Sequence, residues 1–447
     1  MNRHLCVICI FLALLLAVLA ACGNPGGEAD VDEMPSLEEC TFERSRVVIN
    51  GAPDGYSGQK ELEQAFDTDV FYYRDHVDSK GKYGYPILMR AGADGTVKAM
   101  CTISGCRHDS PGCYAYDDSF GRYFTVGGEL YYLKTARQYG DPCLQLYAVT
   151  EDSRQQLADL NGSTEYYFSN ENAVTDGEWL YLMVSREGAE KTLERVRLSD
   201  GTTETLAGFE QLSGGPEDSR VILYPSADGK QVEISGSYGL IELQTVSDDG
   251  GYILFVQKLT PFRSTYAALY VMRAFCVYDG TSTVIAVNER RNNDSGSLPG
   301  RLYFYKGSIY RVRRREAAFE GRSVSDDSWK LLWDLSVERE KLDSMQLKYF
   351  DGTKVIFKGQ KNYPYISITA YIYDMESGQV SVNNFKTRST VLKNRRFPDI
   401  FAMSPDHVII DVVNYEDYTY DLAVMAKADL YAETGQYREI GHVSDFY

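Results

Sequence analysis

Short runs in which apolar or aromatic residues alternate with polar ones fill the chain from Val70 onward. Alternation at period two, bounded by Gly and Asp turns, is typical of β-strands with one buried face. The clearest runs are "VFYYR", "ELYYLK", "WLYLMV", "YILFVQ", "RLYFYK", "KVIFKG" and "HVIIDV". Long helical periods are almost absent, so the pattern predicts an all-β protein.

A second kind of run separates these strands, and consists of an apolar strand, a turn and a polar-leaning strand. It is found in "LMRAGADGTVKAM", "LYAVTEDSRQQL", "RVRLSDGTTETL", "FCVYDGTSTVIAV", "YIYDMESGQVSV" and "LYAETGQYREI", while the fifth copy, "LLWDLSVEREKL", fits poorly. An inner strand therefore alternates with an outer hairpin about seven times, at spacings of about fifty residues, which is the signature of a β-propeller.

The predicted number of blades depends on whether residues Phe209 to Val246 are an insertion or a separate blade. Residues Phe209 to Val246 hold extra strand-like runs, which are either a β insertion or a further blade. We therefore expect seven blades over residues 41–447, with eight as the alternative. The early run "SRVVIN", Ser45 to Asn50, is expected to complete the last blade and close the circle. A pair of β-sandwiches is the competing fold, although sandwich strands rarely repeat at this interval.

The N-terminus has the pattern of an export signal. Arg3 and His4 precede the apolar run "LCVICIFLALLLAVLA", and polar sequence follows at once. The segment Leu19-Ala20-Ala21-Cys22-Gly23 resembles a bacterial lipobox. That resemblance implies a signal peptide over residues 1–21 and a diacylglyceryl group on Cys22, with an acyl chain such as palmitate on its amine. Several acyl chains hold a protein stably at a membrane. An ordinary signal peptide with an incidental cysteine is the alternative.

The segment after the lipobox predicts a linker. Residues 22–40 are acidic and rich in Gly and Pro, with few apolar positions, so they read as a flexible tether. The formal net charge of the whole chain is −18. Such acidity argues against nucleic acid as a partner, because phosphates demand a basic face. The expected location is the extracytoplasmic face of the cell membrane, reached through the lipid.

Two short runs carry a resemblance to known propellers. "SADGKQVEI" and "SPDHVII" are similar to the turn-and-strand repeat of TolB-like and other WD40-like propellers. With the lipobox, the Tyr-rich strands and an early cysteine cluster, the chain resembles Gram-positive surface lipoproteins with propeller bodies, of the domain-of-unknown-function 5050 type. This resemblance implies a propeller at the cell surface and no settled chemistry.

The stretch "MCTISGCRHDSPGC" gathers soft metal ligands. Cys101, Cys106, His108 and Cys113 supply three thiolates and one imidazole, a set that suits tetrahedral zinc. All four positions would be filled by protein, which predicts a structural rather than a catalytic metal. In an oxidising compartment the same cysteines would instead form disulfides, and free thiols are a third reading. The sequence leaves these alternatives open.

Other candidate chemistry is sparse. The chain has no nucleophile elbow, zinc-protease helix or phosphate-binding loop. Its remaining histidines, His76, His407 and His442, are isolated in the sequence and read as turn or surface residues. Trp179, Trp329 and Trp333 are expected either to pack between blades or to bind sugar rings. Tyr363 and Tyr365 lie on a predicted loop and are the better candidates for binding a sugar.

These observations predict a non-catalytic surface lipoprotein whose propeller is a binding or assembly platform for a protein or a glycan. The alternative is a propeller-type glycan hydrolase or lyase that uses carboxylates at the central channel, although the sequence does not select which carboxylates. A metal or redox sensor built on the cysteine cluster is the third hypothesis.

Overall fold

The structure of the chain is a computed structural model, which divides into two units, Met1–Glu39 and Cys40–Tyr447. It describes residues 35–42, 70–77, 83–91, 97–108, 113, 115–116, 122–126, 129–134, 144–150, 153–160, 162, 173–214, 220–225, 231–262, 266–291, 302–305, 307–313, 318–326, 328–336, 344–350, 353–361, 367–383, 385, 400–403, 406–411, 420–433 and 437–443. Among these residues, no helix combines the length and the hydropathy needed to cross a membrane.

The described residues of the second unit form seven antiparallel sheets, each built from strands that are consecutive in the chain. The first three sheets are β1 (Val70–Val77), β2 (Tyr83–Ala91) and β3 (Val97–Ala99); β4 (Arg122–Val126), β5 (Glu129–Lys134), β6 (Gln145–Val149) and β7 (Arg154–Asp159); and β8 (Ala173–Thr175), β9 (Trp179–Val184), β10 (Thr192–Arg197) and β11 (Thr203–Gly208).

The fourth sheet is the largest and has five strands. It comprises β12 (Arg220–Pro225), β13 (Gln231–Val246), β14 (Tyr252–Pro261), β15 (Tyr266–Cys276) and β16 (Ser282–Arg291). The last three sheets are β17 (Leu302–Tyr305), β18 (Ser308–Arg313), β19 (Ala318–Ser323) and β20 (Lys330–Asp334); β21 (Ser344–Phe350), β22 (Lys354–Lys361), β23 (Ser367–Asp374) and β24 (Val380–Asn383); and β25 (Ile400–Met403), β26 (His407–Asp411), β27 (Tyr420–Ala426) and β28 (Arg438–Val443).

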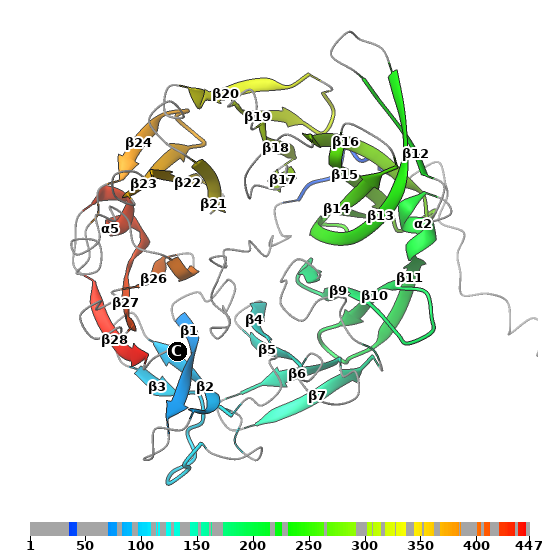
Figure 1. Cartoon of the computed structure of the whole chain (residues 1–447). Coiled ribbons are helices and arrows are strands. Elements are labelled where there is room, and N and C mark those ends of the chain that lie inside the picture. The colour runs from blue at the N-terminus through cyan, green and yellow to red at the C-terminus, as the bar shows by residue number, and fades with distance from the viewer. Residues whose placement is uncertain are drawn as a thin grey trace, which may run out of the picture. The chain divides into compact units, whose positions relative to one another are not determined.

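Neighbouring sheets share apolar cores. One cluster joins the second and third sheets through residues such as Leu146 and Leu182, and another joins the third and fourth through Tyr181 and Phe255. Further shared clusters join the fifth sheet to the sixth and the sixth to the seventh. Strand β1 contacts β25 and β26, so the first sheet meets the last (Figure 1). The fold is therefore an all-β propeller, as the repeat pattern predicts.

The outer hairpins owe their turns to aspartate. In the hairpin of β10 and β11, the Asp200 carboxylate accepts a hydrogen bond from the Thr202 amide at 2.8 Å. Asp279 accepts from the Thr281 amide at 2.8 Å in the same way. Such Asx turns reverse the chain without a longer loop. They explain why short "SDGT" and "YDGT" segments separate an apolar strand from a polar one.

The strong apolar runs do not all occupy the innermost position in their sheets. In four sheets the run forms the second strand, and a separate first strand precedes it, namely β4, β8, β21 or β25; in the fourth sheet the run forms the third strand, β14, after β12 and β13. Several of these first strands are only three to five residues long, as in "AVT" and "IFAM". A strand of that length shows too few alternations to be recognised by periodicity.

The extra runs between Phe209 and Val246 join the fourth sheet. They form a short helix, α2 (Phe209–Ser213), and the hairpin of β12 and β13, which pairs Arg220 with Gly236. The second half of β13 pairs with β14 in the ordinary way. The described residues therefore place this region as a β insertion, and it forms no sheet of its own within them.

Two predicted hairpins are wrong. The run "LYAETGQYREI" begins in a helix, α5 (Lys427–Ala432), and only its last residues enter β28. The poorly fitting "LLWDLSVEREKL" begins in β20, which is the second strand of a hairpin whose first strand is β19. Both errors arise because the true partner strands, "YDLAVMA" and "AFEGRS", show less regular alternation than the runs chosen from sequence.

The segment Cys40–Phe42 lies against the fourth and fifth sheets, although Cys40 was expected to be part of the tether. The Thr41 carbonyl accepts a hydrogen bond from the Asp248 amide at 2.8 Å, and the Thr41 hydroxyl donates to the Asp248 carboxylate at 2.8 Å. The Phe42 side chain is buried, and its ring meets the edge of Phe304 with centroids 4.7 Å apart. The predicted closing strand, Ser45 to Asn50, lies outside the described residues.

Candidate metal centre

The cysteine-rich stretch is an excursion from the third strand of the first sheet. Strand β3 pairs with β2 up to the pair Met89 and Ala99. Continued in that register, Cys101 would lie opposite Ile87, but Tyr116 occupies that place through an isolated antiparallel bridge. The chain therefore leaves the strand after β3 and returns to the same edge of β2. As expected from the sequence, the stretch connects the first sheet to the second.

Local turns shape the excursion. The Cys106 amide donates to the Ile103 carbonyl at 3.1 Å, with Gly105 at a φ of +78°. A glycine adopts this left-handed conformation without steric cost. His108 also has a positive φ, +57°, which histidine tolerates better than most residues. Its amide donates to the Cys106 sulfur at 3.4 Å, so the backbone is folded around that thiol.

The four predicted ligands converge. The sulfur atoms of Cys101, Cys106 and Cys113 and a ring nitrogen of His108 all lie within 4.8 Å of one another. The Nδ1 atom of His108 is 3.3 Å from the Cys113 sulfur. Cys101 and Cys113 are buried, at 7% and 3% exposure, while the other two ligands are partly exposed. The centre thus sits at the base of the excursion, where Cys101 leaves the sheet and Cys113 returns to it.

The Cys113 thiol is in an environment that disfavours an isolated negative charge. Burial is the main cause that raises the pKa of the Cys113 thiol to about 12; hydrogen bonds with the Cys106 and Cys101 thiols act in the same direction, and the backbone of Ala115 opposes them. A divalent cation would reverse this balance, because it stabilises deprotonated sulfur ligands.

The donor set fits zinc. In a tetrahedral zinc site, sulfur ligands 2.3 Å from the ion lie about 3.8 Å from each other, so a small contraction of the cluster would complete the coordination. With four protein ligands no position remains for water, so such an ion would cross-link the two ends of the excursion. No disulfide joins the described cysteines, which are Cys40, Cys101, Cys106, Cys113 and Cys276.

The tryptophans are packing residues. Trp179 is 7% exposed and is flanked by the guanidinium groups of Arg195 and Arg197, 4.2 and 4.4 Å from its ring centroid. Trp329 lies 3.8 Å from the guanidinium carbon of Arg311. Trp333 contacts aromatic rings of the sixth sheet. Cation–π contacts therefore cover part of the Trp179 and Trp329 rings, and Trp333 packs against other aromatic rings.

Several residues named from the sequence lie outside what the structure describes. These are the lipidation residue Cys22, the loop tyrosines Tyr363 and Tyr365, and Cys143. Of the three isolated histidines, only the side chain of His407 is described.

Where the pKa of a described carboxyl group shifts, it shifts downward. Hydrogen bonds from turn amides are the chief cause for Asp200 and Asp279, and hydrogen bonds from Lys354 and Ser377 are the chief causes for Asp374. A general acid for glycoside cleavage needs the opposite shift. The carboxylates of these aspartates accept hydrogen bonds from backbone amides and so stabilise the turns.

Residues 41–447 were predicted to form the propeller, but sequence reasoning did not predict the contacts that Thr41 and Phe42 make with Asp248 and Phe304. The available signal was Phe42, the one aromatic residue at the end of a segment with few apolar side chains. An isolated aromatic next to a tether is a candidate for docking, because its burial contributes more than that of any other residue nearby.

No protein-family model matches the chain, and no curated protein matches it. Solved structures with a similar arrangement include a putative 6-phosphogluconolactonase from Bacteroides fragilis, with 11% identity, coverage of 84% of this chain and 94% of that one, and a TM-score of 0.41. TolB from Acinetobacter baumannii has 12% identity, coverage of 72% and 64%, and a TM-score of 0.34.

The β-propeller domain of the Trilobed protease from Pyrococcus furiosus has 11% identity, coverage of 87% of this chain and 98% of that one, and a TM-score of 0.46. For TolB, the coverage of 64% means that this chain spans slightly less than two thirds of its length. These similarities are loose, and the assignment of the fold rests on the strand order and the shared cores described above.

Proposed function

We propose that this protein is a lipid-anchored protein of the extracytoplasmic face of the cell membrane, whose propeller is a non-catalytic platform that binds or assembles a protein or a glycan. The lipobox-like segment ending at Cys22 supports the anchor, and the Gly- and Pro-rich residues 22–40 support a tether. The resemblance to Gram-positive surface lipoproteins points the same way.

We further propose that Cys101, Cys106, His108 and Cys113 hold one structural zinc ion. The observation that carries this part of the proposal is the convergence of four ligand atoms within 4.8 Å at the base of the excursion. The ion would supply a cross-link and no reaction step, since the protein fills all its coordination positions. A metal used in this way favours a rigid platform over a metalloenzyme.

Apolar side chains on outer strands support a binding role. Leu331 on β20 is 60% exposed and Val380 on β24 is 37% exposed. Both strands lie at the edge of their sheets, where backbone groups can pair with another chain. Exposed apolar residues at such an edge are what a protein partner would cover.

The test is to isolate complexes from detergent extracts with the tagged full chain. We expect a stable partner to co-purify with the wild type and with Phe262→Ser, a control at an exposed apolar residue that lies outside the edge strands. The variant carrying Leu331→Ser and Val380→Ser should release it. The variant Cys22→Ser should move the protein out of the membrane fraction.

Turnover of a defined polysaccharide by the purified body would overturn the non-catalytic proposal. That result would favour the alternative, a propeller-type glycan hydrolase or lyase with carboxylates at the central channel. Retention of Cys22→Ser in the membrane fraction would separately contradict the lipid anchor.

A further inference from the structure

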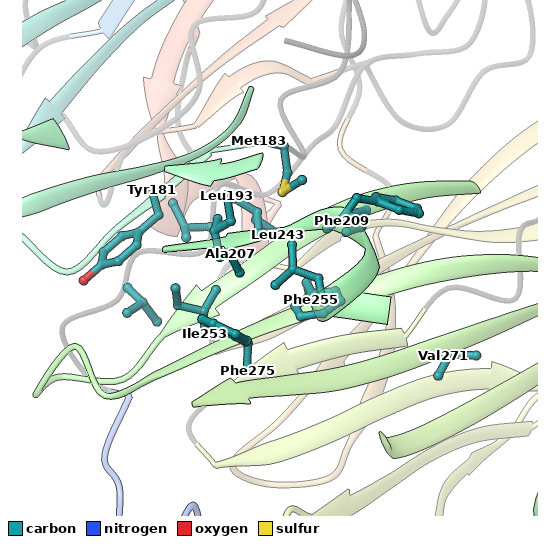
Figure 2. Close-up of a cluster of buried hydrophobic side chains, with 14 of the residues drawn as sticks. Tyr181, Met183, Leu193, Ala207, Phe209, Leu243, Ile253, Phe255, Val271 and Phe275 are labelled. Carbon is teal, nitrogen blue, oxygen red and sulfur yellow. The ribbon is translucent and has the colours of Figure 1, made fainter. Parts of the chain in front are cut away.

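Two polar side chains are buried in the apolar core between the third and fourth sheets. Gln257 on β14 is 0% exposed and Arg273 on β15 is 6% exposed. Because side chains alternate along a strand, they share the face of Phe255 and Phe275, which belong to the core cluster. Figure 2 shows this cluster, with both phenylalanines labelled. A guanidinium group in such surroundings requires a physical explanation.

Both side chains reach the C-terminal end of α2. The Gln257 amide nitrogen donates to the Ser213 hydroxyl at 2.7 Å, and Ser213 is itself 1% exposed. The next residue, Gly214, has a φ of +76°, and a Cβ added there would lie 3.0 Å from Nη1 of Arg273. On the other side, Nη2 of Arg273 donates to the Tyr238 hydroxyl at 2.9 Å. Four polar residues from four elements thus meet beside a glycine.

The hydrogen-bonding capacity of this group is only partly used. The Nε atom of Arg273 and the Oε1 atom of Gln257 are buried and have no hydrogen-bond partner. Among the ion pairs of the described residues, none involves Arg273. A buried charge without a counter-charge is strongly destabilising, as is a buried donor or acceptor left unpaired.

Two other described arginines, the buried Arg322 and the half-buried Arg186, are organised differently. Arg322, which is 7% exposed, donates to the backbone carbonyls of Asp326 and Ile285. Arg186 forms an ion pair with the buried carboxylate of Glu194. In both cases acceptors supplied by the described chain face the guanidinium. Among the described residues, the only acceptor hydrogen-bonded to Arg273 is the Tyr238 hydroxyl, which carries no charge.

We propose that Arg273, Gln257, Ser213 and Tyr238 form a binding site for a carboxylate. The guanidinium is the partner of choice for a carboxylate, because its parallel N–H groups bond both oxygens. The bare Oε1 of Gln257 accepts a hydrogen bond, so it favours a ligand with a hydroxyl or amino donor near the carboxylate. The ligand class is therefore a small hydroxy acid or amino acid. This site is independent of the metal centre and of the lipid anchor.

The experiment uses the full chain and three salts at equal ionic strength, namely sodium glycolate, sodium acetate and sodium chloride. A ligand that binds only the folded state raises the melting temperature with concentration. We expect a saturable rise with glycolate, a smaller one with acetate and none with chloride. In Arg273→Met the dissociation constant for glycolate should rise at least about tenfold, because a charge-assisted pair is lost.

Two further variants sharpen the test. Gln257→Met should reduce the advantage of glycolate over acetate. Arg322→Met is the matched control, which removes another buried guanidinium and should keep the response to glycolate. If Arg273→Met does not fold, calorimetric titration of Arg273→Lys replaces it. Weaker glycolate binding by the lysine variant is expected, and equal binding would contradict the site.

Three results would overturn the proposal. One is the absence of any saturable response in the wild type, and another is an unchanged response in Arg273→Met. The third concerns the acidic residues that follow α2 in the sequence, Glu217 and Asp218. If only the variant Glu217→Gln with Asp218→Asn responds to glycolate, the carboxylate belongs to the chain itself, and a site for a separate ligand is ruled out.

Discussion

The fourth sheet and the first sheet are stabilised in different ways. The fourth has long strands, such as the eleven-residue β15, and shares with the third sheet a core of fully buried side chains that includes Phe255 and Phe275. The first has three described strands, of which β3 is three residues long, and its chain then departs into the cysteine excursion. Apolar burial stabilises one region, and we infer that a cross-link stabilises the other.

This contrast indicates where each region is vulnerable. Removing a large side chain from the fourth sheet leaves a cavity that the surrounding strands cannot fill. Removing a ligand from the excursion leaves the sheet intact but frees the ends of a long loop. Stability then falls because the unfolded chain regains the conformational entropy that the cross-link had removed. The following predictions separate the two mechanisms.

The largest effect is expected in the apolar core. Phe255→Ala should lower the free energy of unfolding by about 4 kcal/mol, since it empties a fully buried position. Urea denaturation followed by tyrosine and tryptophan fluorescence measures this loss. The control is Val380→Ala on the exposed strand β24, which should change stability by less than about 0.5 kcal/mol. A chelator should not alter the difference between Phe255→Ala and the wild type.

The next effect is expected at the excursion. Cys113→Ser should cost about 3 kcal/mol, the scale for releasing a closed loop of this size. The melting temperature of Cys113→Ser should no longer fall when a chelator is added, because the metal site is already lost. The melting temperature of Phe255→Ala should still fall, because its metal site is intact. Chelator-dependent melting curves of the wild type and Cys113→Ser make the comparison. Equal sensitivity in the two proteins would contradict a metal at this site.

A smaller effect is expected where Cys40–Phe42 docks. Phe42→Ala should cost about 2 kcal/mol, less than a core phenylalanine, because a segment near the tether can relax. Thr41→Val removes only the hydroxyl bond to Asp248 and should cost about 0.5 kcal/mol. Limited proteolysis should cut Phe42→Ala faster near residue 40. Unchanged proteolysis would mean that this segment contributes no stability.

The smallest effect is expected at an exposed turn. The Asp374 carboxylate has a lowered pKa, chiefly because it accepts hydrogen bonds from Lys354 and Ser377. Its contribution is therefore present above the pKa of the unfolded chain, about 4, and declines as the pH falls toward the folded value. Asp374→Asn should cost less than about 1 kcal/mol at pH 7 and progressively less below pH 4. A difference that grows on acidification would contradict this assignment.

The class of fold could be predicted because the strongest strands alternate regularly and repeat. The runs that became β5, β9 and β22 carry many apolar residues, and burial between sheets demands them. Short strands such as β8 could not be predicted, because three residues carry too little periodicity. Helix α5 was taken for a strand because its apolar residues, Leu430 and Tyr431, follow one another without a helical period.

The convergence of Cys101, Cys106, His108 and Cys113 could be predicted because these residues are close in sequence and few residue types bind soft metals. The site at Arg273 could not, since its members come from α2, β13, β14 and β15 and meet only in the folded chain. Within a strand, a single Arg among apolar residues, as in "YVMRAFC", gives no sign of whether it faces solvent or the core.

The central claim is that Cys101, Cys106, His108 and Cys113 hold a zinc ion that closes the excursion. The most direct measurement is metal analysis combined with thiol counting on the mature protein purified without oxygen. We predict one zinc per chain, three thiols that become reactive only after chelation, and loss of the metal in the double variant Cys101→Ser with Cys113→Ser. A protein that contains no metal and has these cysteines joined in disulfides would contradict the account.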